Sequence, residues 1–150
     1  MAETVLKSED TKQFIVIKQG KEKYGINISY IHNIVRIQSI TRVPKAPKYM
    51  TGVINLRGEI IPVMSLRLRF GLQAEPFTNT TRIIIVKVSG QAIGIIVDEV
   101  EEVINLRDTD MEMIIKDATD EKANYISGVG KVGTELVTLL NIEGFIVVSN

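Results

Sequence analysis

Histidine and cysteine, on which many enzymes rely for acid–base, nucleophilic or metal chemistry, are scarce in this sequence. The chain has 150 residues, no cysteine and one histidine, His32. Without cysteine there is no disulfide framework and no thiolate metal site, and a site built on His32 would need carboxylates for the rest of its chemistry. We interpret His32 as a surface or boundary side chain. Because the sequence offers no nucleophile–base pair, we expect a protein that is not an enzyme.

A glycine pattern near the C-terminus matches the fingerprint of dinucleotide-binding loops. Gly128, Gly130 and Gly133 fit G-x-G-x-x-G, which cradles a pyrophosphate when it leads into a helix. Here the glycines are followed by residues 135–140, a run typical of a β-strand. We therefore interpret them as a turn between two strands and expect no bound cofactor.

The densest acidic cluster consists of four carboxylates, Asp98, Glu99, Glu101 and Glu102. Carboxylate oxygens can hold a hard cation. Val100, Val103 and Ile104 are interleaved with the acids, a spacing typical of a helix with one buried and one solvated face. We expect this solvated face and no metal site; a metal-dependent hydrolase is the alternative if the carboxylates converge on one point.

Acidic and basic side chains balance over the whole chain, with 18 of each. Proteins that bind duplex nucleic acid carry a basic surplus, so we expect no nucleic-acid partner. The charges are nevertheless segregated: residues 23–58 contain no Asp or Glu, whereas residues 98–121 contain ten acids and two basic side chains. This segregation has two interpretations: chance clustering of solvated charges, or a bipolar surface suited to charged partners or to head-to-tail assembly.

No apolar run approaches the roughly 18–20 residues that cross a bilayer. The N-terminus lacks the basic and apolar regions of a secretory signal. We expect a cytoplasmic protein with no direct insertion into the membrane.

The secondary structure that positions these side chains is predicted to be mainly β-strand, because short runs rich in Ile and Val alternate with turn signals. Strands are expected over residues 14–17, 24–28, 52–57 and 59–64, the last two forming a hairpin at Gly58. Ser29 is a candidate cap of a short helix that carries Ile31 and Ile34. Residues 66–70 suggest one or two helical turns ended by Gly71. The polar stretch 73–81 is the best candidate for a linker.

The second half of the chain repeats the order of features of the first. At an offset of 69 residues Gly25 aligns with Gly94, and at an offset of 76 the segment 49–53 aligns with 125–129, both of the form Tyr-x-x-Gly-Val. We infer a duplication of two small all-β halves, each with too little core to be stable alone.

The tetrapeptide Asn55-Leu56-Arg57-Gly58, between two hydrophobic strands, is the strongest candidate for recognition. Arg57 would present five donors in a rigid fork, suited to carboxylates or carbonyls of a partner. The alternative is an exposed arginine that contributes little.

Residues 42–63, which read Arg-Val-Pro-x-Ala-Pro-x-Tyr-Met-x-Gly-Val-Ile-Asn-Leu-Arg-Gly-Glu-Ile-Ile-Pro-Val, closely resemble the signature of the CheW family. The resemblance extends to Tyr24-Gly25-Ile26, to residues 94–100 and to Tyr125-x-x-Gly128, and it covers about residues 11–147. It implies an all-β fold of two five-stranded Src-homology-3-like β-barrels packed together, with short helices. On that fold we expect a flexible N-terminal tail over residues 1–11, a first barrel over 12–66 and a second over 67–150, with the terminal segment free to return to the first barrel.

The resemblance also implies a function. It predicts a non-catalytic adaptor that couples methyl-accepting chemoreceptors to the histidine kinase CheA in bacterial chemotaxis, cytoplasmic and recruited to membrane-bound receptor arrays. The expected partners are the regulatory domain of CheA and the cytoplasmic tip of the receptor, without cofactor or metal. The partner-binding residues that it predicts are Ile31, Asn33, Ile34, Asn55, Arg57 and Gly58. A small-molecule-binding β-barrel is the alternative, and it would require a sizeable internal pocket lined by polar groups.

The chain departs from the family pattern at one of these positions. Where many members carry Glu in a Val-x-Glu-Ile segment, this chain has Asn33 in Ile31-His32-Asn33-Ile34. Asparagine donates and accepts hydrogen bonds but carries no charge. An ion pair at this position is therefore not expected.

Overall fold

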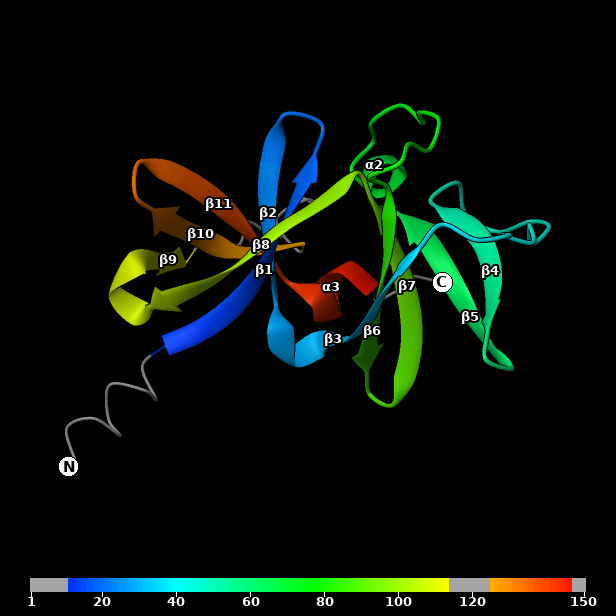
Figure 1. The fold of residues 1–150 in the computed structure, drawn as a ribbon, viewed down its shortest axis with the longest axis horizontal. Helices are drawn as coiled ribbons and strands as arrows, with labels where there is room; N and C mark the ends of the chain where they lie inside the picture. Colours follow the sequence, from blue (N-terminus) through cyan, green and yellow to red (C-terminus); the bar gives the residue numbers. More distant parts are fainter. Residues whose placement is uncertain (1–10, 114–124, 147–150) are drawn as a thin grey trace. The chain divides into compact units, whose positions relative to one another are not determined.

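The computed structural model describes residues 11–113 and 125–146, which form two β-sheets and a few short helices (Figure 1). The predicted all-β class is confirmed. One sheet has the strand order β8-β1-β2-β11-β10-β9. Its strands are β1 (Thr11–Gln19), β2 (Glu22–Asn27), β8 (Glu99–Arg107), β9 (Met111–Met113), β10 (Ile126–Val132) and β11 (Glu135–Leu140).

The other sheet has the order β3-β6-β7-β5-β4. Its strands are β3 (Ile31–Arg36), β4 (Met50–Leu56), β5 (Glu59–Ser65), β6 (Arg82–Val88) and β7 (Gln91–Val97). The helical segments are η1 (Ile28–Tyr30), α2 (Leu66–Arg69), η2 (Asp108–Asp110) and α3 (Ile142–Ile146). No helix in the described part of the chain is long and apolar enough to span a bilayer.

Both sheets close on themselves, as the predicted barrels require. In the five-stranded sheet, Thr41 follows β3 at one end of the strand order and exchanges two backbone hydrogen bonds with Val53 of β4 at the other end (2.9 and 2.8 Å). In the other sheet, β8 continues through η2 into β9, so one segment supplies both ends of the strand order. The extra strand β9 is therefore the counterpart of the Thr41 bridge, and each barrel has five main strands.

Each sheet combines strands from both halves of the predicted duplication. β5 of the first half pairs in parallel with β7 of the second, with Val63 opposite Gly94. β11 of the second half pairs in parallel with β2 of the first, with Leu139 opposite Gly25. Leu139 corresponds to Val63 at the offset of 76 residues, and Gly94 corresponds to Gly25 at the offset of 69, so the two parallel pairs are equivalent. The registers thus support the duplication and show that the two halves exchange strands.

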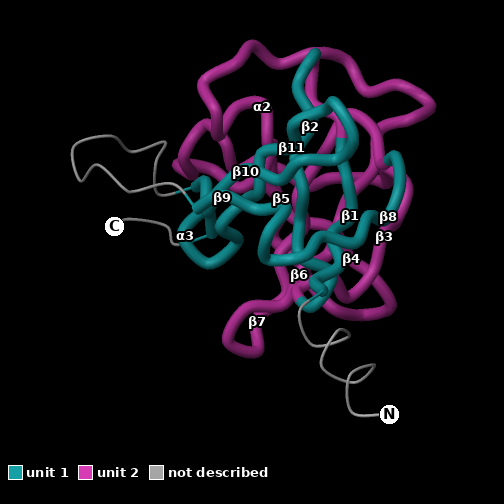
Figure 2. The backbone as a smooth tube through the Cα atoms, turned by 90° about the vertical axis from the view of Figure 1, so that its left-hand side faces the viewer, with its two compact units in different colours: residues 1–17, 21–29, 101–150 teal, residues 18–20, 30–100 magenta. Residues whose placement is uncertain are grey.

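This exchange changes the predicted division of the chain. Figure 2 shows its two compact units, residues 1–17, 21–29 and 101–150 in one and residues 18–20 and 30–100 in the other. The predicted consecutive barrels, 12–66 and 67–150, do not match these units, because β1 and β2 pair with strands that follow residue 98. The stretch 73–81, predicted as a linker, lies inside the second unit. Of the predicted tail 1–11, only Thr11 is among the described residues, and it begins β1.

Each unit has its own apolar core. The core of the first contains Phe14, Val16, Ile104, Leu106, Val137 and Leu139. The core of the second contains Ile54, Ile61, Val63, Ile83, Ile85 and Ile96. In both, the core residues that share a strand are two positions apart, as expected when one face of a pleated sheet is turned inward. The strands β1, β6 and β7 also bury the residues in between, in runs of four consecutive buried positions.

The helix predicted after Ser29 is wrong. The segment is a single 3₁₀ turn followed by strand β3, which pairs with β6. A β-bulge between Ile31 and Asn33 inserts one extra residue, so Ile31 and Ile34 lie opposite Val86 and Ile84. Side chains on one face of a regular strand are two positions apart, but the extra residue of a bulge makes them three apart. A spacing of three is also found on one face of a helix, so the sequence pattern was ambiguous. The helical spacing inferred for the acidic cluster is also wrong, because residues 99–107 form β8.

An added methyl group at Gly94 should disturb the contact between β5 and β7. A Cβ there would lie 2.6 Å from Cγ1 of Val63 and 2.7 Å from Cγ2 of Ile83, both fully buried side chains. We expect Gly94→Ala to lower the free energy of unfolding by about 1–3 kcal/mol, the usual effect of overpacking. Urea unfolding measures this change.

Gly25→Ala is the matched control, since its nearest neighbour is the end of the Leu139 side chain at 3.0 Å. We expect a smaller loss, below about 1 kcal/mol. Equal stability losses for the two variants would contradict the close approach of β5 and β7 as the cause.

Candidate partner-binding surfaces

Arg57 and Gly58 form the two-residue turn between β4 and β5. Leu56 and Glu59 are the last paired residues, and φ is +54° at Arg57 and +86° at Gly58. Positive φ at both positions is typical of a type I′ turn, which matches the twist of the flanking strands. The Asn55 Oδ1 accepts a hydrogen bond from the Gly58 backbone N–H (3.0 Å), which fixes the turn. The predicted tetrapeptide is therefore an exposed hairpin tip.

An arginine is an unfavourable residue for this turn. The left-handed backbone costs an L-residue about 1–2 kcal/mol relative to the usual conformation. Its counterpart in the repeat is Gly133, which has nearly the same φ, +61°, at little conformational cost. Within the described residues, the Arg57 side chain has no hydrogen bond or ion pair. A strained, exposed cation without an internal partner favours recognition over a structural role.

The second predicted group lies on β3. The bulge at His32 places Ile31 and Ile34 on one face of the strand, where both are half-buried. The Asn33 Oδ1 accepts a hydrogen bond from the Ile34 backbone N–H (2.8 Å). Since the amide oxygen is used locally, Asn33 has its NH₂ donors to offer to a partner. His32 itself is exposed, in agreement with its interpretation as a surface side chain.

The hairpin tip and the β3 group belong to the same unit but do not form one cluster. The bridge that closes the barrel joins β4 to Thr41, beyond the end of β3, and not to the predicted β3 residues. No hydrogen bond or ion pair in the described chain joins Arg57 to the β3 residues. The structure thus presents two candidate recognition elements on one barrel.

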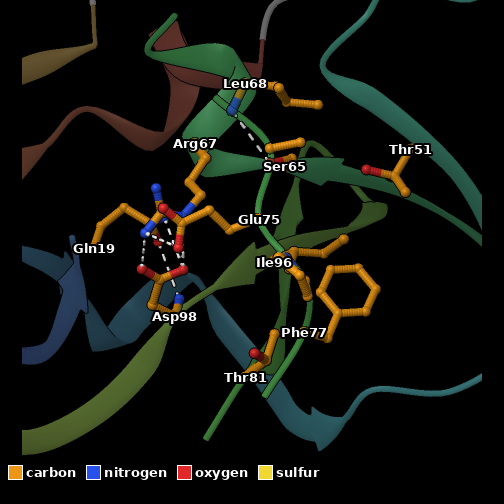
Figure 3. A pocket seen from close by; sticks show the side chains of 12 residues that line it. Gln19, Thr51, Ser65, Arg67, Leu68, Glu75, Phe77, Thr81, Ile96 and Asp98 are labelled. Atoms are coloured by element: carbon orange, nitrogen blue, oxygen red, sulfur yellow. Dashed lines mark hydrogen bonds and ion pairs between the residues drawn. The ribbon is translucent and has the colours of Figure 1, made fainter. Parts of the chain in front are cut away.

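Asp98 is the centre of a polar network that was not predicted from the sequence (Figure 3). Its carboxylate accepts hydrogen bonds from Arg67 Nε (3.1 Å), Arg67 Nη2 (2.7 Å), Gln19 Nε2 (3.0 Å) and the Gly20 backbone N–H (3.0 Å). The Asp98 backbone N–H donates to Gln19 Oε1 (3.0 Å). The network joins the β1–β2 turn and α2 to the end of β7. Asp98 is therefore a structural acid.

The pKa of Asp98 reflects two opposing causes. Burial is the largest single influence and raises the pKa, but the hydrogen bonds from Arg67, Gly20 and Gln19 and the charge of Arg67 together outweigh it. The pKa is therefore held below its ordinary value. The charged form is the one that the fold stabilises.

The acidic cluster does not converge on one point. Asp98 faces Arg67, whereas Glu101 pairs with Lys23 of β2 (3.2 Å), which also pairs with Glu135 of β11 (3.0 Å). Residues 11–113 and 125–146 contain no group of three or more side chains arranged to hold a metal ion. The geometry gives no support to a metal-dependent hydrolase.

Arg67 and Asp98 also line a small cavity of about 150 Å³, together with Phe77, Ile96 and Thr51 (Figure 3). Pockets that hold small molecules usually measure roughly 300–1,000 Å³. This cavity is too small to support the alternative of a small-molecule-binding barrel. The glycine pattern leads into strand β11 and not into a helix, so it does not form the phosphate cradle of a dinucleotide-binding loop. Gly128 and Gly130 lie within β10, however, and only Gly133 lies in the predicted turn.

Comparison with known proteins decides the family. A model described as the CheW-like domain matches residues 13–149. The chain belongs to the CheW-like family. It is 40% identical over 136 residues to the chemotaxis protein CheW of Helicobacter pylori, covering 91% of this chain and 82% of that protein. It is 30% identical to the chemotaxis protein CheW of Klebsiella aerogenes, with 88% and 80% covered.

A solved structure agrees with this assignment. The scaffolding protein TtCheW from Thermoanaerobacter tengcongensis superposes with a TM-score of 0.84 at 34% identity, covering 92% of this chain and 94% of that one. The likeness confirms the predicted fold class of two small β-barrels.

The distant partners of Asp98, 79 residues away at Gln19 and 31 at Arg67, explain why the sequence pattern alone missed this network.

Asp98→Asn should lower stability in a pH-dependent way. We expect a loss of about 1 kcal/mol at pH 7, at the low end for charged hydrogen bonds, because the side chain is 35% exposed to solvent. The depressed pKa means that the carboxylate stabilises the fold above its unfolded pKa, near 4, and ceases to do so as pH falls through its folded pKa. Unfolding free energies at pH 7 and in steps below pH 4 measure this.

The exposed neighbour Glu102 provides the matched control, Glu102→Gln. It should leave stability within about 0.5 kcal/mol of the native value at pH 7. A stability difference between Asp98→Asn and the native chain that is constant with pH would contradict the assigned role of the charge.

Proposed function

We propose that this chain is a non-catalytic adaptor that couples methyl-accepting chemoreceptors to the histidine kinase CheA in bacterial chemotaxis. Family membership supports the chemotaxis role, since the relatives are named chemotaxis protein CheW and the solved neighbour is named a scaffolding protein. The observation that carries the coupling role is the strained, exposed Arg57 at the β4–β5 tip. The adaptor would be cytoplasmic and recruited to membrane-bound receptor arrays through its partners.

The two recognition elements suit different contacts. Ile31 and Ile34 share one face of β3, and an apolar strip of this kind can bury the face of a helix such as those of a receptor's cytoplasmic tip. Arg57 carries a planar fork of donors, which matches a carboxylate or paired carbonyls on the kinase regulatory domain or on the receptor. Two rigidly held elements would let the adaptor fix both partners without any chemical step of its own.

Arg57→Ala should weaken assembly without destabilising the fold. The side chain has no internal partner, and Ala meets the same left-handed backbone as Arg, so the midpoint of thermal unfolding should stay within about 2 °C. Binding should fall by about tenfold or more, as for a buried charged hydrogen bond at an interface. Co-sedimentation with a receptor cytoplasmic fragment and CheA measures assembly.

Two variants separate charge from geometry. Arg57→Lys keeps the charge but loses the fork, and we expect it to bind nearly as poorly as Arg57→Ala. Lys87→Ala, at an exposed position on β6, removes a charge elsewhere and should bind normally. Native levels of both partners in the Arg57→Ala pellet would rule out the proposed role of this residue.

Asn33→Asp tests the β3 element separately. Aspartate can keep the hydrogen bond from the Ile34 N–H but replaces the NH₂ donors with acceptors. We expect weaker receptor binding, by a few-fold, while binding of CheA alone and thermal stability stay unchanged. Isothermal titration against each partner alone measures the split; an equal loss for both partners would contradict a receptor-facing role.

A further inference from the structure

A second surface of the same barrel carries an unassigned hollow. It measures about 420 Å³ and lies over residues 42–48, with Met50 and Thr51 on its wall. Three cationic side chains line it, Arg42, Lys45 and Lys48, and no acidic side chain does. All three are exposed, and none has an ion pair with another residue of the described chain.

The loop that carries these cations is held in one shape. The Thr41–Val53 bridge fixes its start, and the Met50 backbone N–H donates to the Pro47 carbonyl (2.9 Å) near its end. The Ser65 backbone N–H donates to the Tyr49 carbonyl (2.8 Å). A loop that is already ordered loses little entropy when it binds. The cations are therefore presented in a preorganised arrangement.

Two further observations concern the positive charge of this loop. Lys45 has φ +63°, in the left-handed region that lysine seldom adopts. The Arg69 guanidinium of α2 stacks over the Tyr49 ring, 4.1 Å from its centroid, which adds a fourth cation beside the loop. Val43, 44% exposed, offers an aliphatic contact between the charges.

This surface is separate from the Arg57 tip. The loop precedes β4 and the tip follows it, and the seven residues of β4 span roughly 20 Å at about 3.3 Å per residue. One partner segment of a few residues cannot cover both ends. A short segment bound in the hollow would therefore not reach the Arg57 tip.

We propose that the hollow over residues 42–51 docks an acidic segment of a protein partner. Its carboxylates would pair with Arg42, Lys45 and Lys48, and an aliphatic side chain between them would contact Val43. The proposal rests on the proposed function, because the partner that carries the acidic segment is expected in the complex that the adaptor assembles. Three cations on a chain of zero net charge suit a short acidic peptide better than duplex nucleic acid, whose tight binding needs a larger basic surplus.

The test uses the full chain and a defined probe, a 12-residue peptide of alternating Glu and Leu, with a matched Lys–Leu peptide as control. Amide chemical shifts are followed by NMR during the titration. We expect shifts confined to residues 41–53 with the Glu peptide and none with the Lys peptide. Affinity should fall several-fold between 50 and 200 mM salt, as expected for contacts between exposed charges.

Three variants define the outcome. R42E/K45E/K48E should weaken binding of the Glu peptide at least tenfold, whereas K12E/K18E/K87E, with the same change in net charge at exposed positions elsewhere, should stay within twofold. Lys45→Gly relieves the left-handed backbone, so it keeps the fold even where the triple variant does not, and it should weaken binding about threefold. Equal effects of the two triple variants, or shifts centred on Arg57, would overturn the proposal. So would tighter binding of a 12-base-pair DNA duplex at 150 mM salt.

A parallel experiment keeps the two proposals apart. Co-sedimentation of the native chain with receptor fragment and CheA reports on the adaptor function alone. If the native chain fails there but binds the Glu peptide, the proposed function is wrong and the acidic-peptide site stands. If it assembles normally but the peptide titration is flat, only the docking of an acidic segment is overturned.

Discussion

In both sheets, a glycine lets two strands from different halves of the duplication lie in parallel contact. Gly94 faces Val63 and Ile83, and Gly25 faces Leu139 and Val137, in corresponding registers. A side chain at either glycine would occupy space that core residues already fill. Because each core draws residues from both halves, neither half can complete a barrel by itself. The interleaved units and the closed barrels both follow from these two contacts.

The same contacts explain how a rigid surface can carry a strained residue. β5 is paired on both sides, with β4 and β7, so the turn that leads into it is fixed by a strand in the middle of the sheet. The equivalent turn in the other sheet, between β10 and β11, contains Gly133, for which the left-handed backbone costs little. Backbone strain persists only where the surrounding structure over-determines it. The well-paired β4–β5 hairpin supplies that support, and Arg57 can be placed for contact with a partner.

The sequence predicted most of the strands, the hairpin at Gly58, the short α2 helix before Gly71 and the family, because these depend on local pattern or on a long ordered motif. It failed where distant pairing decides. The bulge at His32 turned a strand into an apparent helix. The division into units depends on which strands pair in parallel, and turn signals do not specify this. Asp98 looked like a solvated acid because its partners, Arg67 and Gln19, come from other elements.

The structure divides the basic residues of the acid-free stretch into paired and unpaired cations. Lys23, at the start of the acid-free stretch, is neutralised within the first unit by Glu101 and Glu135. Arg42, Lys45, Lys48 and Arg57, later in that stretch, have no ion pair among the described residues of the second unit. Charges that are already paired contribute little to the recognition of a partner, whereas unpaired charges on a rigid surface set its orientation and rate of encounter. The cations at the tip and over the residue 42–51 hollow are therefore available to a partner, whereas the charge of Lys23 is used within the fold.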